Sequence, residues 1–188
     1  MPIPLILASG SPRRRELLSV AFSTFEVIPA DIDETLPPGI PLVQGPEYLA
    51  LQKARTVAAR YPEALVIGSD TGVFIDGKML GKPASREEGA GMLRELSGRE
   101  HSVITGCALI LGDHEHSFSE ETLVRMYLLS EPEIQSYLDL GVYRDKAGSY
   151  AIQGKGALLI EGITGDYSNV VGFPIGRLVR EIQAFLGQ

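Results

Sequence analysis

The sequence predicts an α/β protein in which strands and helices alternate around one sheet. Short apolar runs of strand character, such as residues 64–68, alternate with segments whose apolar residues recur at helical spacing. The 188 residues suit a single domain over residues 1–188, or two small lobes that share one core. Hydrophobic residues make up 44% of the chain and charged residues 22%, as in ordinary globular proteins.

Strands are expected at residues 4–8, 25–29, 64–68 with 73–75, 101–111, 123–128 and 157–163. The run at 64–68 is continuous and apolar, which is typical of a strand buried on both faces. Asp76 and Gly77 form a tight hairpin signal. The strands at 101–111 and 123–128 are expected to pair across a polar loop at 112–121.

Helices are expected after Ser11, at about residues 46–61, after Ser85, after Ser130 and at residues 175–186. Ser11 precedes a proline, and the other two serines each precede a glutamate by three residues, so all three are N-cap candidates. Glycines close two of these helices, at Gly98 and Gly141. The faces expected to be buried carry Leu17, Leu18 and Ala21; Leu51, Ala54, Ala58 and Tyr61; and Ile175, Leu178, Val179, Ile182, Phe185 and Leu186.

The composition argues against several functional classes. The net charge of -7 disfavours broad binding to nucleic acid or to an anionic membrane, although a local basic pocket can still hold a small anion. No apolar run approaches the roughly 18 residues of a membrane helix. The first positive charges follow the first apolar run, which is the reverse of a secretory signal. The single Cys107 rules out an internal disulfide and favours a reducing compartment such as the cytoplasm.

The turn at residues 9–15 (SGSPRRR) gives the first functional signal. A strand ends, Gly10 permits close backbone approach, and three consecutive arginines occupy the first turn of a helix. Exposed cations at that end of a helix interact unfavourably with the helix dipole, which destabilises the helix by roughly 0.3–1 kcal/mol each. A polyphosphate bound there would make the same cations favourable. The alternative is a solvated basic turn, and at least one arginine is expected to face solvent because consecutive residues do not share a helix face.

The segment Ser69-Asp70-Thr71 gives the second signal, because it directly follows the apolar run at 64–68. Ligands bind at the carboxyl ends of strands in α/β sheets, where a carboxylate can bind a divalent metal or accept a proton from water. The competing interpretation of Asp70 is a turn residue that bonds to nearby backbone N–H groups.

Three weaker signals accompany these two. The acidic cluster at residues 31–34 contains Glu34 and suits Mg²⁺ or Mn²⁺, although a solvated loop is the favoured interpretation. Lys53 and Lys82 are each able to hold a phosphate, although isolated lysines usually lie on the surface. The glycine-rich segment around Gln153 offers an amide donor and acceptor for a nucleobase edge, with a purely structural loop as the alternative.

These signals occur in an order that resembles the Maf family of nucleoside triphosphate pyrophosphatases, also called septum-formation-inhibitor-like proteins. The resemblance covers nearly the whole chain. It is carried by residues 9–18, 31–34, 53–54, 69–71, 81–83, 96–98 with 101–105, and 145–148 through Gln153. The arginine motif and the Ser-Asp-Thr motif are specific in combination.

The resemblance implies an elongated mixed β-sheet flanked by helices, with two lobes around a central cleft. A homodimer is a further family-level expectation. The implied roles are water activation by Asp70; phosphate binding by Arg13 and Arg14, with Ser9 and Ser11 in the same turn; metal binding by Glu34 and Asp70; neutralisation of the triphosphate by Lys53 and Lys82; and substrate choice at Arg13, Thr71 and Gln153.

The resulting hypothesis is metal-assisted hydrolysis of dTTP and UTP, or of modified pyrimidine triphosphates, to the monophosphate and diphosphate. The sequence around Gln153 resembles the subgroup that acts on dTTP and UTP. One alternative is a non-catalytic, nucleotide-binding regulator of cell division, which would not need Asp70, Glu34 and both lysines together. Another is an interaction domain whose charged turns only face water.

Overall fold

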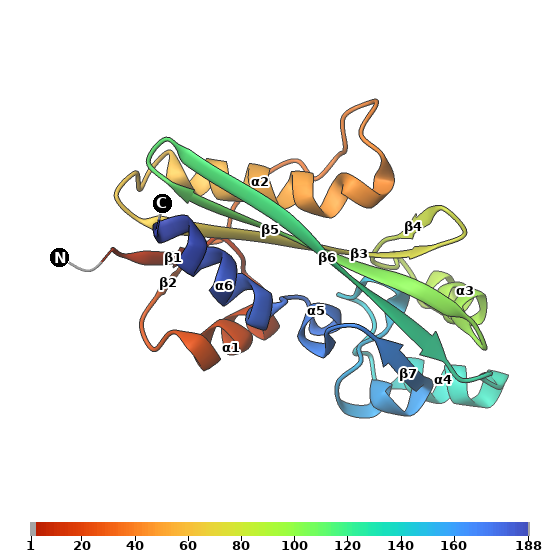
Figure 1. Cartoon of the computed structure of the whole chain (residues 1–188). Helices are drawn as coiled ribbons and strands as arrows, with labels where there is room; N and C mark the ends of the chain where they lie inside the picture. The colour runs from red at the N-terminus through yellow and green to blue at the C-terminus, as the bar shows by residue number, and fades with distance from the viewer. Residues whose placement is uncertain (1–2, 188) are drawn as a thin grey trace.

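The computed structural model describes residues 3–187 and contains a long mixed sheet flanked by helices (Figure 1). Its strands are β1 (Leu5–Leu7), β2 (Glu26–Val27), β3 (Leu65–Ile75), β4 (Lys78–Leu80), β5 (Glu100–Leu111), β6 (His114–Met126) and β7 (Ile160–Thr164). Its α-helices are α1 (Pro12–Ala21), α2 (Gly45–Ala58), α3 (Arg86–Leu96), α4 (Glu131–Asp139), α5 (Tyr167–Val171) and α6 (Ile175–Leu186). Short 3-10 helices lie at Leu42–Gln44, Ala147–Ser149 and Gly154–Leu159. The predicted fold class is confirmed.

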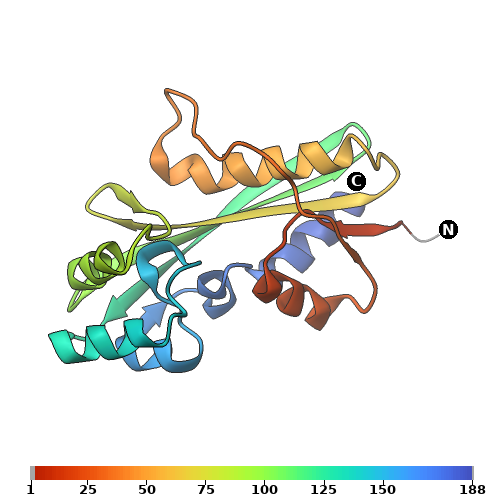
Figure 2. The same ribbon diagram turned by 180° about the vertical axis from the view of Figure 1, so that it is seen from behind.

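The sheet combines parallel and antiparallel pairing. Strand β1 is parallel to β2 and β3, whereas β5, β6 and β7 follow as antiparallel neighbours in the order β2-β1-β3-β5-β6-β7, and β4 pairs with β3. Helix α2 lies on one face, α1 and α6 lie on the other, and α3 and α4 lie near the far end (Figure 2). Two apolar clusters lie on opposite faces at one end of the sheet, one under α2 and one under α1 and α6, and a third lies at the other end with α3 and α4. No helix within residues 3–187 is long and apolar enough to cross a membrane.

Two glycines allow helix α2 to pack closely on the sheet. A Cβ atom at Gly68 would overlap the carbonyl oxygen of Ala50, and one at Gly106 would overlap the backbone of Glu47. Because the helix lies so close, the side chain of Lys53 is buried against the middle of β3. The glycines therefore fix where this lysine meets the sheet.

The segment Ser69-Asp70-Thr71 does not follow the end of a strand, so this part of the prediction was wrong. Strand β3 continues through it, and Asp70 pairs with Gly106 of β5. Pairing along the whole strand satisfies the backbone hydrogen bonds of β3. Asp70 and Thr71 are polar because they line a cavity beside the strand, and not because the strand ends there. The alternative interpretation of Asp70 as a turn residue is also excluded.

The prediction of a polar loop at residues 112–121 was also wrong. Strand β6 begins at His114 and pairs directly with Leu111 of β5, which leaves a turn of Gly112 and Asp113. This half of β6 exposes or half-exposes nearly all its side chains, so its sequence looks like a loop. The last strand begins at Ile160, because residues 157–159 belong to a 3-10 helix, and the second strand shortens to β2.

The predicted helix starts are confirmed. Ser11 and Ser85 accept hydrogen bonds from backbone N–H groups in the first turns of α1 and α3, and Ser130 donates its own N–H to Glu133 at 2.7 Å. The short helix α5 was not expected from the sequence.

The predicted buried faces are confirmed only in part. Helix α1 buries Leu18 alone, whereas Leu17 is half-buried and Ala21 is exposed, because α1 covers an edge where β1 has only three residues. In α2 the buried face includes Ala54 and Ala58 but is rotated away from Leu51, and the helix ends before Tyr61. In α6, Leu178 and Ile182 are buried, and the other predicted positions are half-buried or, at Leu186, exposed.

Candidate active site

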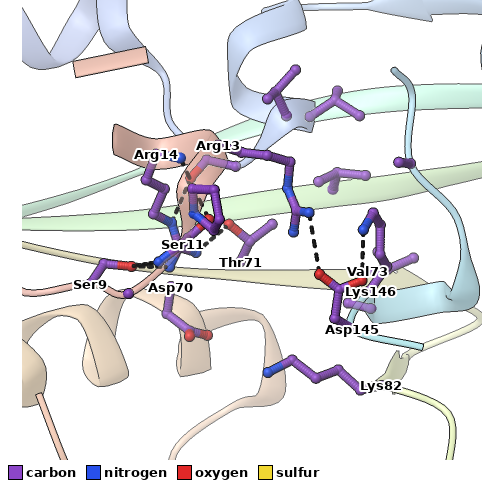
Figure 3. Close-up of a pocket in the computed structure, with 18 of the residues that line it drawn as sticks. Ser9, Ser11, Arg13, Arg14, Asp70, Thr71, Val73, Lys82, Asp145 and Lys146 are labelled. Atoms are coloured by element: carbon purple, nitrogen blue, oxygen red, sulfur yellow. Dashed lines mark hydrogen bonds and ion pairs between the residues drawn. The ribbon is translucent and has the colours of Figure 1, made fainter. Parts of the chain in front are cut away.

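A cavity of about 420 Å³ lies beside the middle of the sheet (Figure 3). It is lined by the turn before α1, the middle of β3, the segment around the 3-10 helix Ala147–Ser149 and the end of α5. All the residues proposed from the sequence line it: Ser9, Ser11, Arg13, Arg14, Glu34, Lys53, Asp70, Thr71, Lys82 and Gln153. The structure thus brings ten positions from separate motifs into one cleft.

The net charge of the side chains that line this cavity is positive, whereas the net charge of the whole protein is negative. Five cations and three carboxylates line it, although the chain carries a net charge of -7. The cations are Arg13, Arg14, Lys53, Lys82 and Lys146, and the carboxylates are Glu34, Asp70 and Asp145. A local positive excess in an acidic protein favours binding of a small polyanion.

The three arginines of α1 point in different directions. Arg14 donates from Nε to the carbonyl of Gly172 at 2.9 Å, from Nη1 to Ser9 Oγ at 3.1 Å, and from Nη2 to Thr71 Oγ1 at 3.0 Å. Arg13 also lines the cavity, whereas Arg15 is exposed, as the sequence predicted for at least one arginine. The first helical turn thus presents two of its three arginines to the cavity.

Arg14 is a charged group in a poorly solvated place. Burial lowers its pKa, and the nearby charge of Asp70 raises it. An arginine keeps its proton even so. A half-buried guanidinium with neutral hydrogen-bond partners favours an anion in the adjoining cavity, because that anion would compensate its charge.

Arg13 is held by a carboxylate from the opposite side of the cavity. Its Nη1 lies 3.4 Å from Oδ2 of Asp145, whose Oδ1 accepts a hydrogen bond from Lys146 at 2.7 Å. Burial opposes ionisation of Asp145, but Lys146 and Arg13 lower its pKa overall. Sequence reasoning assigned no role to Lys146, although its place in the motif at 145–148 was a usable signal.

Lys53 lies between two carboxylates. Its ammonium is 2.6 Å from Oε1 of Glu34 and 2.7 Å from Oδ1 of Asp70. The lysine side chain is only 9% exposed, so the surface position that the sequence alone favoured for Lys53 was wrong. Burial opposes ionisation of Glu34, but the hydrogen bond and charge of Lys53 lower its pKa overall.

Lys82, Gln153 and several apolar side chains, here called the apolar wall, also line the cavity. Lys82 follows β4, and Figure 3 shows its side chain reaching toward the cavity. Gln153 precedes the 3-10 helix Gly154–Leu159. The apolar wall includes Val73, Val103, Ile152, Val170 and Val171. Apolar side chains and an amide in one cavity are typical of a site for a flat heterocycle.

Sequence reasoning missed several supporting residues. Tyr150 lines the cavity, and its hydroxyl lies 2.7 Å from Nε2 of His101. Burial lowers the pKa of His101 to about 4, so this ring is neutral at pH 7. Thr105 supports Thr71 from β5 at 2.9 Å. His101 and Thr105 lie in the motif at 101–105, and Tyr150 lies in the one that runs from 145 to Gln153, but these motifs gave no sign of the contacts that the three side chains make.

The carboxylates fit a divalent cation only with help from a ligand. No group of three or more His, Cys, Asp and Glu side chains converges within residues 3–187. Glu34 and Asp70 nevertheless share one cation, the ammonium of Lys53, which shows that both reach a common point. Two carboxylates with substrate phosphates and water suit Mg²⁺, which is usually bound in this way.

Two proteins with curated names are similar to this one over almost the entire chain. The dTTP/UTP pyrophosphatase of Symbiobacterium thermophilum is 50% identical over 181 residues, covering 96% of this chain and 93% of that one. The dTTP/UTP pyrophosphatase of Bacillus velezensis is 46% identical and covers 96% of each chain. A solved structure of the Staphylococcus aureus Ham1 protein aligns with 65% of this chain and 71% of its own, at 18% identity and a TM-score of 0.48, and nothing about function follows from it.

A family model described as "Maf-like protein" matches residues 4–185. This match includes every residue of the cavity described above. The protein with this cleft therefore belongs to the Maf family.

Proposed function

We propose that the protein hydrolyses dTTP and UTP between the α- and β-phosphates, releasing the nucleoside monophosphate and diphosphate. The observation that carries this proposal is the carboxylate of Asp70 in one cavity with five cationic side chains. The relatives named dTTP/UTP pyrophosphatase support the substrate class.

The cations are proposed to hold the triphosphate from several sides. Arg13 and Arg14 approach from the start of α1, whereas the lysines come from α2, from the segment after β4 and from the segment before the 3-10 helix Ala147–Ser149. Such groups stabilise the charge that develops on the leaving diphosphate. Arginine suits this role because its planar fork matches phosphate oxygens.

Asp70 is proposed to orient and deprotonate the attacking water. Its Oδ1 accepts a hydrogen bond from Lys53, and no protein group within residues 3–187 bonds its Oδ2. That second oxygen is the proposed acceptor for a proton of the water, whose oxygen forms a bond to the α-phosphorus as the bond to the β-phosphate breaks. A positioned general base contributes roughly 10²–10⁴-fold to a rate.

Glu34 and Asp70 are the proposed ligands of a divalent cation, Mg²⁺ or Mn²⁺. When bound there, the cation would supply charge neutralisation to the phosphate oxygens. Lys53 contacts both carboxylates and lowers the pKa of Glu34, so that it keeps Glu34 ionised for this role.

Gln153 is proposed to select the base. Uracil and thymine present a carbonyl acceptor at O4 and a donor at N3. A single amide complements both, since its NH₂ group donates and its oxygen accepts. The apolar wall of the same cavity would pack against the flat ring.

The test is an incubation of the purified protein with UTP, dTTP, CTP or ATP and Mg²⁺, followed by separate assays of diphosphate and orthophosphate. The proposal expects diphosphate from UTP and dTTP. Binding of UTP without any product would support the non-catalytic regulator, and neither binding nor product would support the interaction domain. Release of orthophosphate alone would show cleavage at the γ-phosphate and overturn the proposal.

A cytoplasmic location is part of the same proposal. The chain has one cysteine, Cys107, which is buried in the sheet, and burial raises the pKa of its thiol to about 12. A thiol that stays unpaired and protonated suits a reducing compartment. Homodimer formation stays a prediction.

A further inference from the structure

We propose that Thr105 is a positioning residue that fixes the guanidinium of Arg14 through the hydroxyl of Thr71. It follows that Thr71 uses its only proton inside the protein and donates no hydrogen bond to the nucleotide. This inference rests on the proposed function at one point, which is that Arg14 binds a phosphate of the substrate.

A line of four groups from four elements connects the cavity to the core. Arg14 Nη2 lies 3.0 Å from Thr71 Oγ1, which lies 2.9 Å from Thr105 Oγ1. Thr105 Oγ1 lies 3.1 Å from the carbonyl oxygen of Asn169. The line starts in α1, crosses β3 and β5, and ends in α5. Thr105 and Asn169 are both fully buried.

The chemistry of the two ends fixes the direction of every hydrogen bond in this line. A guanidinium only donates, so Thr71 accepts from Arg14. A carbonyl only accepts, so Thr105 gives its one proton to Asn169. The remaining bond must therefore run from the Thr71 hydroxyl to Thr105. No hydroxyl proton in the line is left for a ligand.

Helix α5 anchors both ends of this arrangement. The side chain of Asn169 donates to the carbonyl of Val103 at 3.0 Å and to Thr122 Oγ1 at 2.9 Å, which fastens the helix to β5 and β6. Three residues later, the carbonyl of Gly172 accepts from Arg14 Nε at 2.9 Å. Gly172 has a φ of 120°, a conformation that favours glycine.

The line of hydrogen bonds and the Gly172 contact hold the guanidinium from two sides before any ligand arrives. A side chain held in this way loses little conformational freedom on binding and keeps its remaining N–H groups in a fixed direction. Arg14 also donates to Ser9 at 3.1 Å, so its plane is set by three partners. Thr105 sets one of them without contacting the cavity itself.

The test compares Thr105→Val, which has the same shape but no hydroxyl, with Thr105→Ser, which keeps the hydroxyl. Diphosphate release from UTP gives kcat and KM for each variant, and thermal unfolding reports on folding. Thr105→Val is expected to raise KM about tenfold, as for the loss of one hydrogen bond next to a charged group. Thr105→Ser is expected to stay near the wild type. Thr105→Ala replaces Thr105→Val if the latter does not fold.

A double-mutant cycle with Arg14→Lys separates positioning from a general structural effect. A lysine has no fork for Thr71 to orient, so Thr105→Val is expected to have little further effect on kcat/KM in that background. An equal loss in both backgrounds would show that Thr105 does not act through Arg14 and would overturn the inference. Unchanged kinetics of Thr105→Val in the wild-type background would overturn it as well.

Failure of the proposed function would be recognised separately, because the wild type would then release no diphosphate from UTP. In that case the same variants are compared by their dissociation constants for inorganic tripolyphosphate, measured by calorimetry. The same order is expected, with weaker binding by Thr105→Val and recovery in Thr105→Ser. Equal binding by all variants would overturn the inference.

Discussion

Replacing Asp70 with asparagine removes one negative charge from the middle of β3 and keeps the size of the side chain. The amide oxygen introduced there can still accept the hydrogen bond from Lys53, which is 2.7 Å in the wild type. Lys53 also retains its ion pair with Glu34 at 2.6 Å. The cavity should therefore survive the substitution, at a loss of about 1–2 kcal/mol of unfolding free energy.

The effect on turnover is expected to be far larger. An asparagine takes no proton from water, so the contribution of the general base, roughly 10²–10⁴-fold in kcat, is lost, which corresponds to about 3–5 kcal/mol of activation free energy. Without Mg²⁺, the affinity for UTP is expected to be equal or higher, because one carboxylate fewer offsets the cations that line the cavity. Diphosphate release and UTP calorimetry measure the two quantities.

Two further carboxylates serve as comparisons. Asp76→Asn changes an exposed carboxylate in the turn after β3, outside the cavity, and should leave kcat unchanged. Glu34→Gln removes a proposed metal ligand but not the base, so it should raise the Mg²⁺ concentration needed for activity and recover at high Mg²⁺. If kcat of Asp70→Asn stays within about threefold of the wild type, or recovers at high Mg²⁺ like Glu34→Gln, Asp70 is not the base.

Three other substitutions probe the fold and the site. Gly68→Ala places a methyl group against the Ala50 carbonyl and should lower the unfolding free energy by about 1–3 kcal/mol in urea titration; unchanged stability would contradict the close packing of α2. The unfolding free energy of the wild type should fall by up to about 3 kcal/mol as the pH drops from 6.5 to 4. The reason is that His101 has a pKa of about 4 in the folded protein and 6.5 in the unfolded chain, so the unfolded chain binds the proton first. In His101→Phe, denaturation at several pH values should show a smaller dependence of the unfolding free energy on pH. An unchanged dependence would show that groups other than His101 cause it. Gln153→Ala should reduce the preference for UTP over CTP in kcat/KM by about tenfold; an unchanged ratio would remove Gln153 from base selection.

Local patterns in the sequence predicted much of the fold. Ser11 and Ser85 mark helix starts through capping that depends only on neighbouring residues. The path of β3 through Asp70 and the exposed half of β6 could not be predicted in this way, because pairing with β5 keeps polar residues in strands. Tertiary hydrogen bonding there outweighs the local pattern.

The sequence also predicted which residues line the cavity, but it did not predict which of them contact one another. The motifs named ten of the residues that line it, yet they did not reveal that Lys53 joins Glu34 to Asp70. Arg13 meets Asp145 across 132 positions of the chain, a separation at which no spacing rule applies. Such partners are set by how α1, β3 and the segment before the 3-10 helix Ala147–Ser149 pack together.

The central claim is that water, activated by Asp70, attacks the α-phosphorus of a pyrimidine triphosphate held by the cations of this cavity. The most direct measurement is hydrolysis of UTP in ¹⁸O-labelled water, followed by mass spectrometry of both products. One labelled oxygen is expected in UMP and none in the diphosphate. Label in the diphosphate would place the attack on the β-phosphorus and contradict this mechanism.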